Sequence, residues 1–120
     1  MSKFDVNEFQ NQVNKAIDEI SFYENLKSGE ITAYGTNLTE IKQKAEDILF
    51  HQDIKPYICP SLTNITNDIK TVANSITPSL VTAILAGTLT IPLNPVIFGY
   101  IAILIVKEGI SSFCSDLQDK

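Results

Sequence analysis

Apolar residues recur every three or four positions through much of the chain, which is the spacing of one helix face. The first amphipathic helix is predicted over residues 5–26, with an apolar face of Phe9, Val13, Ile17, Ile20 and either Phe22 or Tyr23. Asp5 and Glu8 have the spacing of a capping box at its start, and Gly29 is suited to end it. A second amphipathic helix is predicted to begin at about Thr36 or Asn37, with apolar positions Leu38, Ile41, Ala45, Ile48 and Leu49.

Prolines divide the next part of the chain. Pro56 and Pro60 disfavour helix for the residues before them, so a break is expected at DIKPYICP. A third helix is predicted from about Ser61 to Ile76, because Leu62, Ile65, Ile69, Val72 and Ile76 share one side.

Two dipeptides predict further helix starts. Thr77-Pro78 and Asn94-Pro95 each place a capping side chain before a proline, a pattern typical of a first helical turn. They predict a fourth helix at about 78–89, a turn through TIPLN, and a fifth helix from about Pro95 to Leu117. Residues 78–117 would then form a helical hairpin.

The strongest single feature is the stretch from Ser79 to Val106, which contains no charged side chain. Its second part, residues 96–106, is rich in β-branched and aromatic residues, so a buried strand is an alternative to helix. The length of the run and its continuation through Val106, Ile110, Phe113 and Leu117 at helical spacing favour helix.

The apolar stretch has three interpretations. The first is a single kinked membrane span. Pro92, Asn94 and Pro95 interrupt the stretch, however, so each part reaches only about 18–20 Å, too short to cross an average bilayer untilted. A hairpin that inserts into a membrane is the second interpretation, and Ala83-x-x-x-Gly87 would let its helices approach closely. We favour the third, an all-α bundle of about five helices in which the last helix is central and covered by the others. The candidate residues for this core or membrane hairpin are Leu80, Ile84, Leu85, Ile97, Phe98, Ile101, Leu104 and Ile105.

Composition places these helices in one domain. The chain has 120 residues, of which 44% are hydrophobic, enough for one buried core. Residues 1–58 carry ten acidic residues and six lysines, whereas residues 59–120 carry four and three. The expected organisation is therefore a single domain over 1–120, with acidic amphipathic helices in 1–58 and an apolar helical region in 59–120.

Charge and the N-terminal residues restrict partners and location. A net charge of −5 with no arginine argues against binding to nucleic acid or to an anionic lipid surface. The start MSKFDVNEFQNQ lacks the apolar segment of a signal peptide, so a cytoplasmic location is expected, with membrane association as the alternative. Lysine as the sole basic residue, with many Asn and Ile residues, is typical of an AT-rich genome and suggests a bacterial or phage origin.

Residues with catalytic or ligand chemistry are few. Cys59 and Cys114 have no CxxC spacing and His51 has no partner nearby in sequence, so we predict no metal, no cofactor and no catalytic residue. In a reducing compartment, two free thiols are favoured over a disulfide. If the third, fourth and fifth helices run up, down and up, the cysteines fall at opposite ends, beyond the roughly 7 Å between Cα atoms that a disulfide allows.

These observations favour a small non-catalytic interaction protein of the adaptor, immunity or regulatory kind, which binds a protein partner. The candidate contacts are aromatic residues in or next to predicted connections, although each is also explained by packing within the bundle: Phe22, Tyr23, Tyr34 and Tyr57. The alternative is a membrane-inserting protein, such as a pore-forming toxin or a membrane-bound immunity factor, that uses the 78–106 hairpin. No oligomeric state is predicted.

Overall fold

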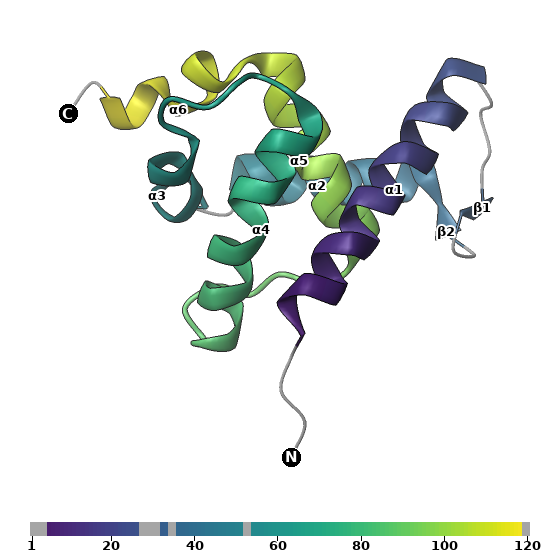
Figure 1. Cartoon of the computed structure of the whole chain (residues 1–120), viewed down its shortest axis with the longest axis horizontal. Helices are drawn as coiled ribbons and strands as arrows, with labels where there is room; N and C mark the ends of the chain where they lie inside the picture. The colour runs from purple at the N-terminus through teal and green to yellow at the C-terminus, as the bar shows by residue number, and fades with distance from the viewer. Residues whose placement is uncertain (1–4, 27–31, 34–35, 52–53, 119–120) are drawn as a thin grey trace.

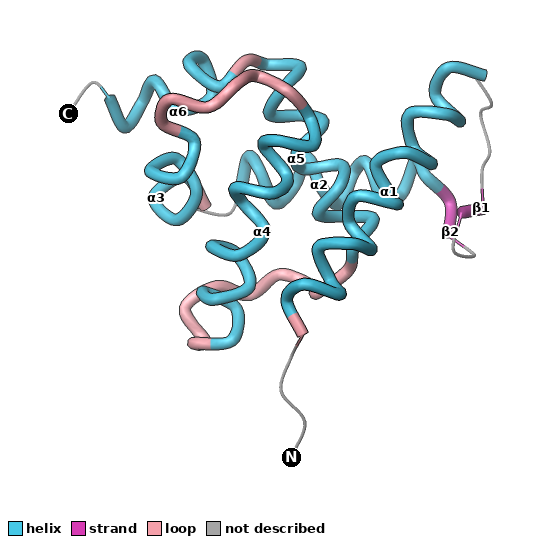
Figure 2. The backbone as a smooth tube through the Cα atoms, in the orientation of Figure 1, coloured by secondary structure: helices cyan, strands magenta, loops and turns pink. Residues whose placement is uncertain are grey.

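The computed structural model describes residues 5–26, 32–33, 36–51 and 54–118 (Figures 1 and 2). The described part of the chain is all-α apart from one very short hairpin, as the apolar pattern predicted. Its elements are α1 (Val6–Leu26), β1 (Thr32–Ala33), β2 (Thr36–Asn37), α2 (Leu38–His51), α3 (Lys55–Ile58), the 3-10 helix η1 (Cys59–Leu62), α4 (Ile69–Leu85), α5 (Pro95–Glu108) and α6 (Ile110–Gln118).

The two amphipathic helices of the first half are confirmed. The Asp5 carboxylate accepts a hydrogen bond from the Glu8 backbone N–H at 3.1 Å, so Asp5 caps α1. The predicted end of this helix near Gly29 lies outside the described residues. Between α1 and α2, β1 and β2 pair antiparallel where the sequence indicated only a polar connection.

The helix α5 forms the centre of the molecule, with α1, α2 and α4 packed around it (Figure 1). The region 96–106 is therefore helix, and the strand alternative is wrong. Asn94 caps α5 as predicted, because its Oδ1 accepts hydrogen bonds from Val96 N–H at 2.8 Å and Ile97 N–H at 3.4 Å. Against α1, the rings of Phe98 and Phe9 meet edge to face with centroids 4.9 Å apart.

The predicted third and fourth helices are one helix, α4, and the start expected at Thr77-Pro78 is wrong. Pro78 lies inside α4 and is exposed. Because proline has no backbone N–H, the carbonyl of Asn74, which is also exposed, has no helical hydrogen bond from position 78. Water can reach this group, since it lies on the solvent side of the helix. The buried stripe continues across the proline through Val72, Ala73, Ile76, Thr77, Leu80 and Val81.

The start predicted at Ser61 is also wrong. Helical turns, α3 and η1, occupy the stretch where the prolines predicted a break, and Pro56 and Pro60 lie in their first turns. A loop over residues 63–68 follows, and α4 begins only after Asp68. The Asp68 carboxylate accepts hydrogen bonds from the backbone N–H and the hydroxyl of Thr71, both at 3.1 Å. This side-chain cap fixes the start of α4.

The predicted fifth helix is divided into α5 and α6 at Gly109. The backbone φ of Gly109 is +96°, a conformation that ends an α-helix and that glycine adopts without steric cost. The Gly109 N–H still donates to the Ile105 carbonyl, while Phe113 N–H donates to the Gly109 carbonyl, both at 2.8 Å. The helix direction therefore changes between Glu108 and Ile110.

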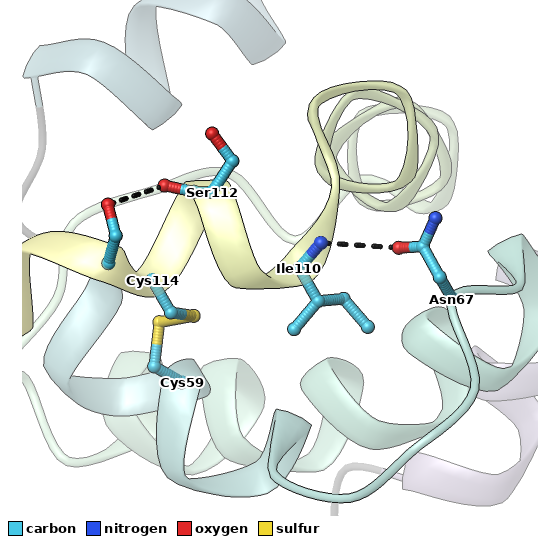
Figure 3. Close-up of a disulfide and its surroundings, with 6 residues drawn as sticks. Cys59, Asn67, Ile110, Ser112 and Cys114 are labelled. Carbon is cyan, nitrogen blue, oxygen red and sulfur yellow. Dashed lines mark hydrogen bonds between the residues drawn. A yellow bond between two sulfur atoms is a disulfide. The ribbon is translucent and has the colours of Figure 1, made fainter. Parts of the chain in front are cut away.

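Cys59 and Cys114 form a disulfide, which corrects the expectation of two free thiols at opposite ends of the bundle (Figure 3). Their Cα atoms are 5.9 Å apart. The up-down-up arrangement fails because the two predicted middle helices are one, and because the break at Gly109 allows α6 to lie against α3. Cys114 is thereby brought to Cys59 in η1.

Candidate functional site

The residues predicted to form a core or membrane hairpin lie mostly in the interior. Leu80, Ile97, Phe98, Ile101 and Ile105 are buried, and Ile84 and Leu104 are half-buried. Leu85 differs from the rest, because 59% of it is exposed.

The predicted small-residue contact through Ala83 and Gly87 does not form as a pair on one helix face. Gly87 lies beyond the end of α4, with φ +81°. The close helix approach instead involves Gly99 of α5, where an added Cβ would lie 3.2 Å from Ile17 Cγ1 of α1. This approach accounts for a glycine in the middle of the central helix.

Only one of the four candidate partner contacts has a described side chain. Phe22 and Tyr23 lie within α1, and Tyr34 lies outside the described residues. Tyr57 lies in α3, is 36% exposed, and donates a hydrogen bond of 3.5 Å from its hydroxyl to the Thr88 carbonyl. The structure therefore connects Tyr57 with the α4–α5 connection.

Three large apolar side chains are exposed among the described residues, and all lie on or next to this connection. They are Leu85 at the end of α4, Leu93 just before α5, which is 37% exposed, and Tyr57, which reaches Thr88 between them. We call Tyr57, Leu85 and Leu93 the apolar patch. No charged residue occurs in residues 71–106, so the connection itself is uncharged.

Local backbone structure explains why Leu85 is exposed. The N–H of Thr88 donates to the Ala83 carbonyl and that of Gly87 to the Ile84 carbonyl, both at 3.0 Å. This pair of bonds with a left-handed glycine is a Schellman motif, which ends α4 sharply. Leu85 is left on the last helical turn, on the side away from the core.

The rest of the connection is held against the core by alternate residues. Leu89 and Ile91 are buried, whereas Thr88, Thr90 and Pro92 are exposed. Such alternation is typical of an extended segment with one face on the core. It holds the connection in place, with Leu93 exposed before the capped start of α5.

Sequence reasoning identified only part of this patch. Tyr57 was a candidate contact, whereas Leu85 was grouped with the core and Leu93 was not singled out. The signals that were available are Gly87, whose position two residues after Leu85 suits a helix C-terminus, and the alternating apolar residues of LTIPL. Neither signal alone places the end of the helix at Leu85, because the apolar pattern predicts a fourth helix that continues to about residue 89.

A pocket of about 440 Å³ lies between the 63–68 loop and the α5–α6 break. Asn67 lines it, and its Nδ2 donates to the Val106 carbonyl at 3.3 Å. Its Oδ1 accepts from Ile110 N–H at 3.2 Å (Figure 3). Hydroxyl and amide groups supply the polar lining, and no lining residue has a titratable side chain. The full lining is Leu62, Thr63, Asn64, Ile65, Asn67, Gly109, Ile110 and Ser111.

Two further findings concern the described residues only. No group of three or more His, Cys, Asp or Glu side chains among them is placed to hold a metal ion. None of the described helices combines the length and the apolar character that a bilayer crossing requires.

Comparison with known proteins adds no relative: no protein-family model, no curated protein and no solved structure matches this chain.

Proposed function

We propose that the protein is a small non-catalytic helical interaction module that binds a protein partner through the apolar patch. The observation that carries the proposal is the position of Tyr57, Leu85 and Leu93, the large hydrophobic residues exposed in the described part of the chain, around a single connection. Apolar surface that is exposed and contiguous is typical of interaction sites, and these three side chains are exposed along or beside one connection.

The composition of the patch supports a protein partner in particular. Protein interfaces combine an apolar, often aromatic centre that is depleted in charge with a polar rim. Here Tyr57 supplies the aromatic group, and the exposed Thr88 and Thr90 supply polar groups beside Leu85 and Leu93. Tyrosine is also among the residues that contribute most to binding when an interface buries them.

A membrane-inserting function is the alternative, and packing makes it the weaker one. Insertion of the 78–106 hairpin requires α5 to leave α1 and α2, which cover it, and exposes the edge-to-face contact between Phe9 and Phe98. Most large apolar side chains of this hairpin are buried, and Leu85 and Leu93 are the exposed ones.

The proposal also covers location and the remaining partner classes. The acidic charge supports a module that binds neither nucleic acid nor anionic lipid. A cytoplasmic location remains a prediction. The Cys59–Cys114 disulfide is unusual for this location, because disulfides in the cytoplasm are rare and, where present, are usually redox-sensing or catalytic.

The test replaces the patch with charge. The double variant Leu85→Lys/Leu93→Lys is compared with Asn74→Lys/Thr63→Lys, which adds the same charge at exposed positions elsewhere. With a photo-crosslinking side chain at Thr88 in each protein, expressed in cells, we expect one discrete adduct that the patch variant loses and the control variant keeps. Far-UV circular dichroism checks that both variants are folded.

The other occupants of the patch are outcomes of the same test. Flotation of the protein with phosphatidylcholine vesicles, lost in the patch variant, together with no protein adduct, would overturn the proposal in favour of the membrane alternative. An adduct formed equally by the patch variant and the control also contradicts it.

A further inference from the structure

α6 buries few side chains in the rest of the molecule. Among its residues with a described side chain, Phe113 and Cys114 are buried, whereas Ser111 and Ser112 are exposed. An isolated helix of nine residues is only marginally stable in water, so α6 depends on its attachments. The attachments that its described side chains provide are Phe113 and Cys114, the half-buried Ile110, which packs against the core, and a few polar contacts.

The backbone next to α6 is suited to rotation. Gly109 joins α5 to α6 with φ +96°, and a Cβ added there would meet no atom within 4 Å beyond its chain neighbours. α5 is covered mainly by α1, α2 and α4, and α6 adds Phe113 and Cys114 to the same core cluster. Figure 1 shows α6 on the side of the molecule away from α1.

Besides the packing of Phe113 and Ile110, the described residues of α6 have two polar contacts to other elements, whose partner residues are partly or fully exposed. Lys55 Nζ of α3 lies 5.1 Å from the centre of the Phe113 ring, and Asn67 binds Ile110 N–H at 3.2 Å. The disulfide between Cys59 and Cys114 is the covalent link across the same interface (Figure 3). It joins α6 to η1, directly after α3.

We propose that residues 110–118 form a redox-controlled segment: reduction of the Cys59–Cys114 disulfide releases α6 about Gly109 while the core of α1, α2, α4 and α5 stays folded. Release uncovers apolar surface that the oxidised protein buries, namely Phe113 on α6. This inference does not depend on the proposed partner or on the apolar patch.

The reductant that this step requires is a dithiol. One thiolate of the dithiol attacks Sγ of Cys59, which at 9% exposed is the more accessible cysteine, and Cys114 leaves as a thiolate that takes a proton from water. The second thiol of the dithiol then attacks the mixed disulfide and frees Cys59. Two electrons pass to the protein, which gains two thiols, and the dithiol becomes a cyclic disulfide.

Hydrogen exchange of the full chain tests this proposal. Exchange is measured by mass spectrometry on the oxidised protein and after reduction with dithiothreitol, with thiol alkylation to confirm each state. We expect protection of the amides of residues 110–118 to fall at least about tenfold on reduction, to near that of an unfolded chain, while α4 and α5 stay clearly protected even though loss of the cross-link lowers their protection as well. The control is Cys59→Ser/Cys114→Ser, in which dithiothreitol should change nothing.

Three results would overturn the proposal. The first is unchanged protection of residues 110–118 in the reduced protein, which means that packing alone holds α6. The second is a complete loss of protection in α4 and α5 as well, which makes the disulfide a requirement of the whole fold. The third is the finding of free thiols in the folded, air-oxidised protein. If the double variant does not fold, the reduced wild-type protein still separates these outcomes.

Discussion

Asn67 forms hydrogen bonds on both sides of the Gly109 break, to the Val106 carbonyl and to Ile110 N–H. We expect Asn67→Ala to lower the free energy of unfolding by about 1–2 kcal/mol, because each of two exposed hydrogen bonds contributes roughly 0.5–1.5 kcal/mol. Urea unfolding of the oxidised protein measures this change. Thr63→Ala, in the same exposed loop, is the matched control and should stay within about 0.5 kcal/mol of wild type; an equal loss in both would assign no role to the Asn67 amide.

Gly99 shows that a single missing methyl group can set the distance between two helices. An added Cβ would lie 3.2 Å from Ile17 Cγ1 and 3.6 Å from the Ile17 backbone N. We expect Gly99→Ala to destabilise the protein by about 1 kcal/mol, because overpacking costs roughly 1–3 kcal/mol and the helix propensity of alanine returns up to about 1 kcal/mol.

A double-mutant cycle identifies the cause of the Gly99 effect. In an Ile17→Ala background, the cost of Gly99→Ala should disappear or change sign, because the clashing Cγ1 atom is gone. Chemical denaturation of the four proteins gives the coupling free energy. A Gly99→Ala protein that is more stable than wild type would show that the helices separate without cost.

At the scale of elements, a capping residue followed by proline predicted two helix starts, of which one is correct and one is wrong. Asn94-Pro95 begins α5 because Asn94 accepts the first N–H bonds of the helix. Thr77-Pro78 lies inside α4, where the Thr77 hydroxyl donates to the Ala73 carbonyl at 2.7 Å and is buried. Local capping chemistry predicted both, and only the continuous buried stripe of α4, a tertiary property, separates them.

Pro78 therefore weakens the helix that it lies in. Pro78→Ala is expected to stabilise the protein by about 2 kcal/mol, since the roughly 3 kcal/mol cost of an interior proline exceeds the roughly 1 kcal/mol by which proline restricts the unfolded chain. Thermal and urea unfolding measure the change, and Thr82→Ala provides the control at an exposed position one turn further along α4. A loss of stability in Pro78→Ala would mean that α4 needs a proline bend to follow the core.

For the whole molecule, the pattern of apolar residues was enough to predict an all-α fold with a covered apolar helix at its centre. It was not enough to place Cys59 beside Cys114. That proximity depends on α4 running through Pro78 and on the change of direction at Gly109. The apolar patch was missed in part for a similar reason, since the exposure of Leu85 follows from the exact end of α4.

The disulfide should also determine the stability of the whole fold. Cys59 and Cys114 are 55 residues apart, and closing a loop of that length removes about 4 kcal/mol of chain entropy from the unfolded state. We expect Cys59→Ala/Cys114→Ala to lower the free energy of unfolding by up to about this amount and to raise the urea m value, because the unfolded chain exposes more surface. Far-UV circular dichroism follows the transition, since the chain has no tryptophan.

Reduced wild-type protein is the reference for this variant, because it retains both sulfur atoms without the cross-link. A similar loss in the reduced protein and in the alanine variant assigns the effect to the cross-link, whereas a larger loss in the alanine variant assigns the excess to packing of the two buried side chains. A change below about 1 kcal/mol on reduction would contradict the loop-entropy account. The contribution of the disulfide would then be confined to the position of α6.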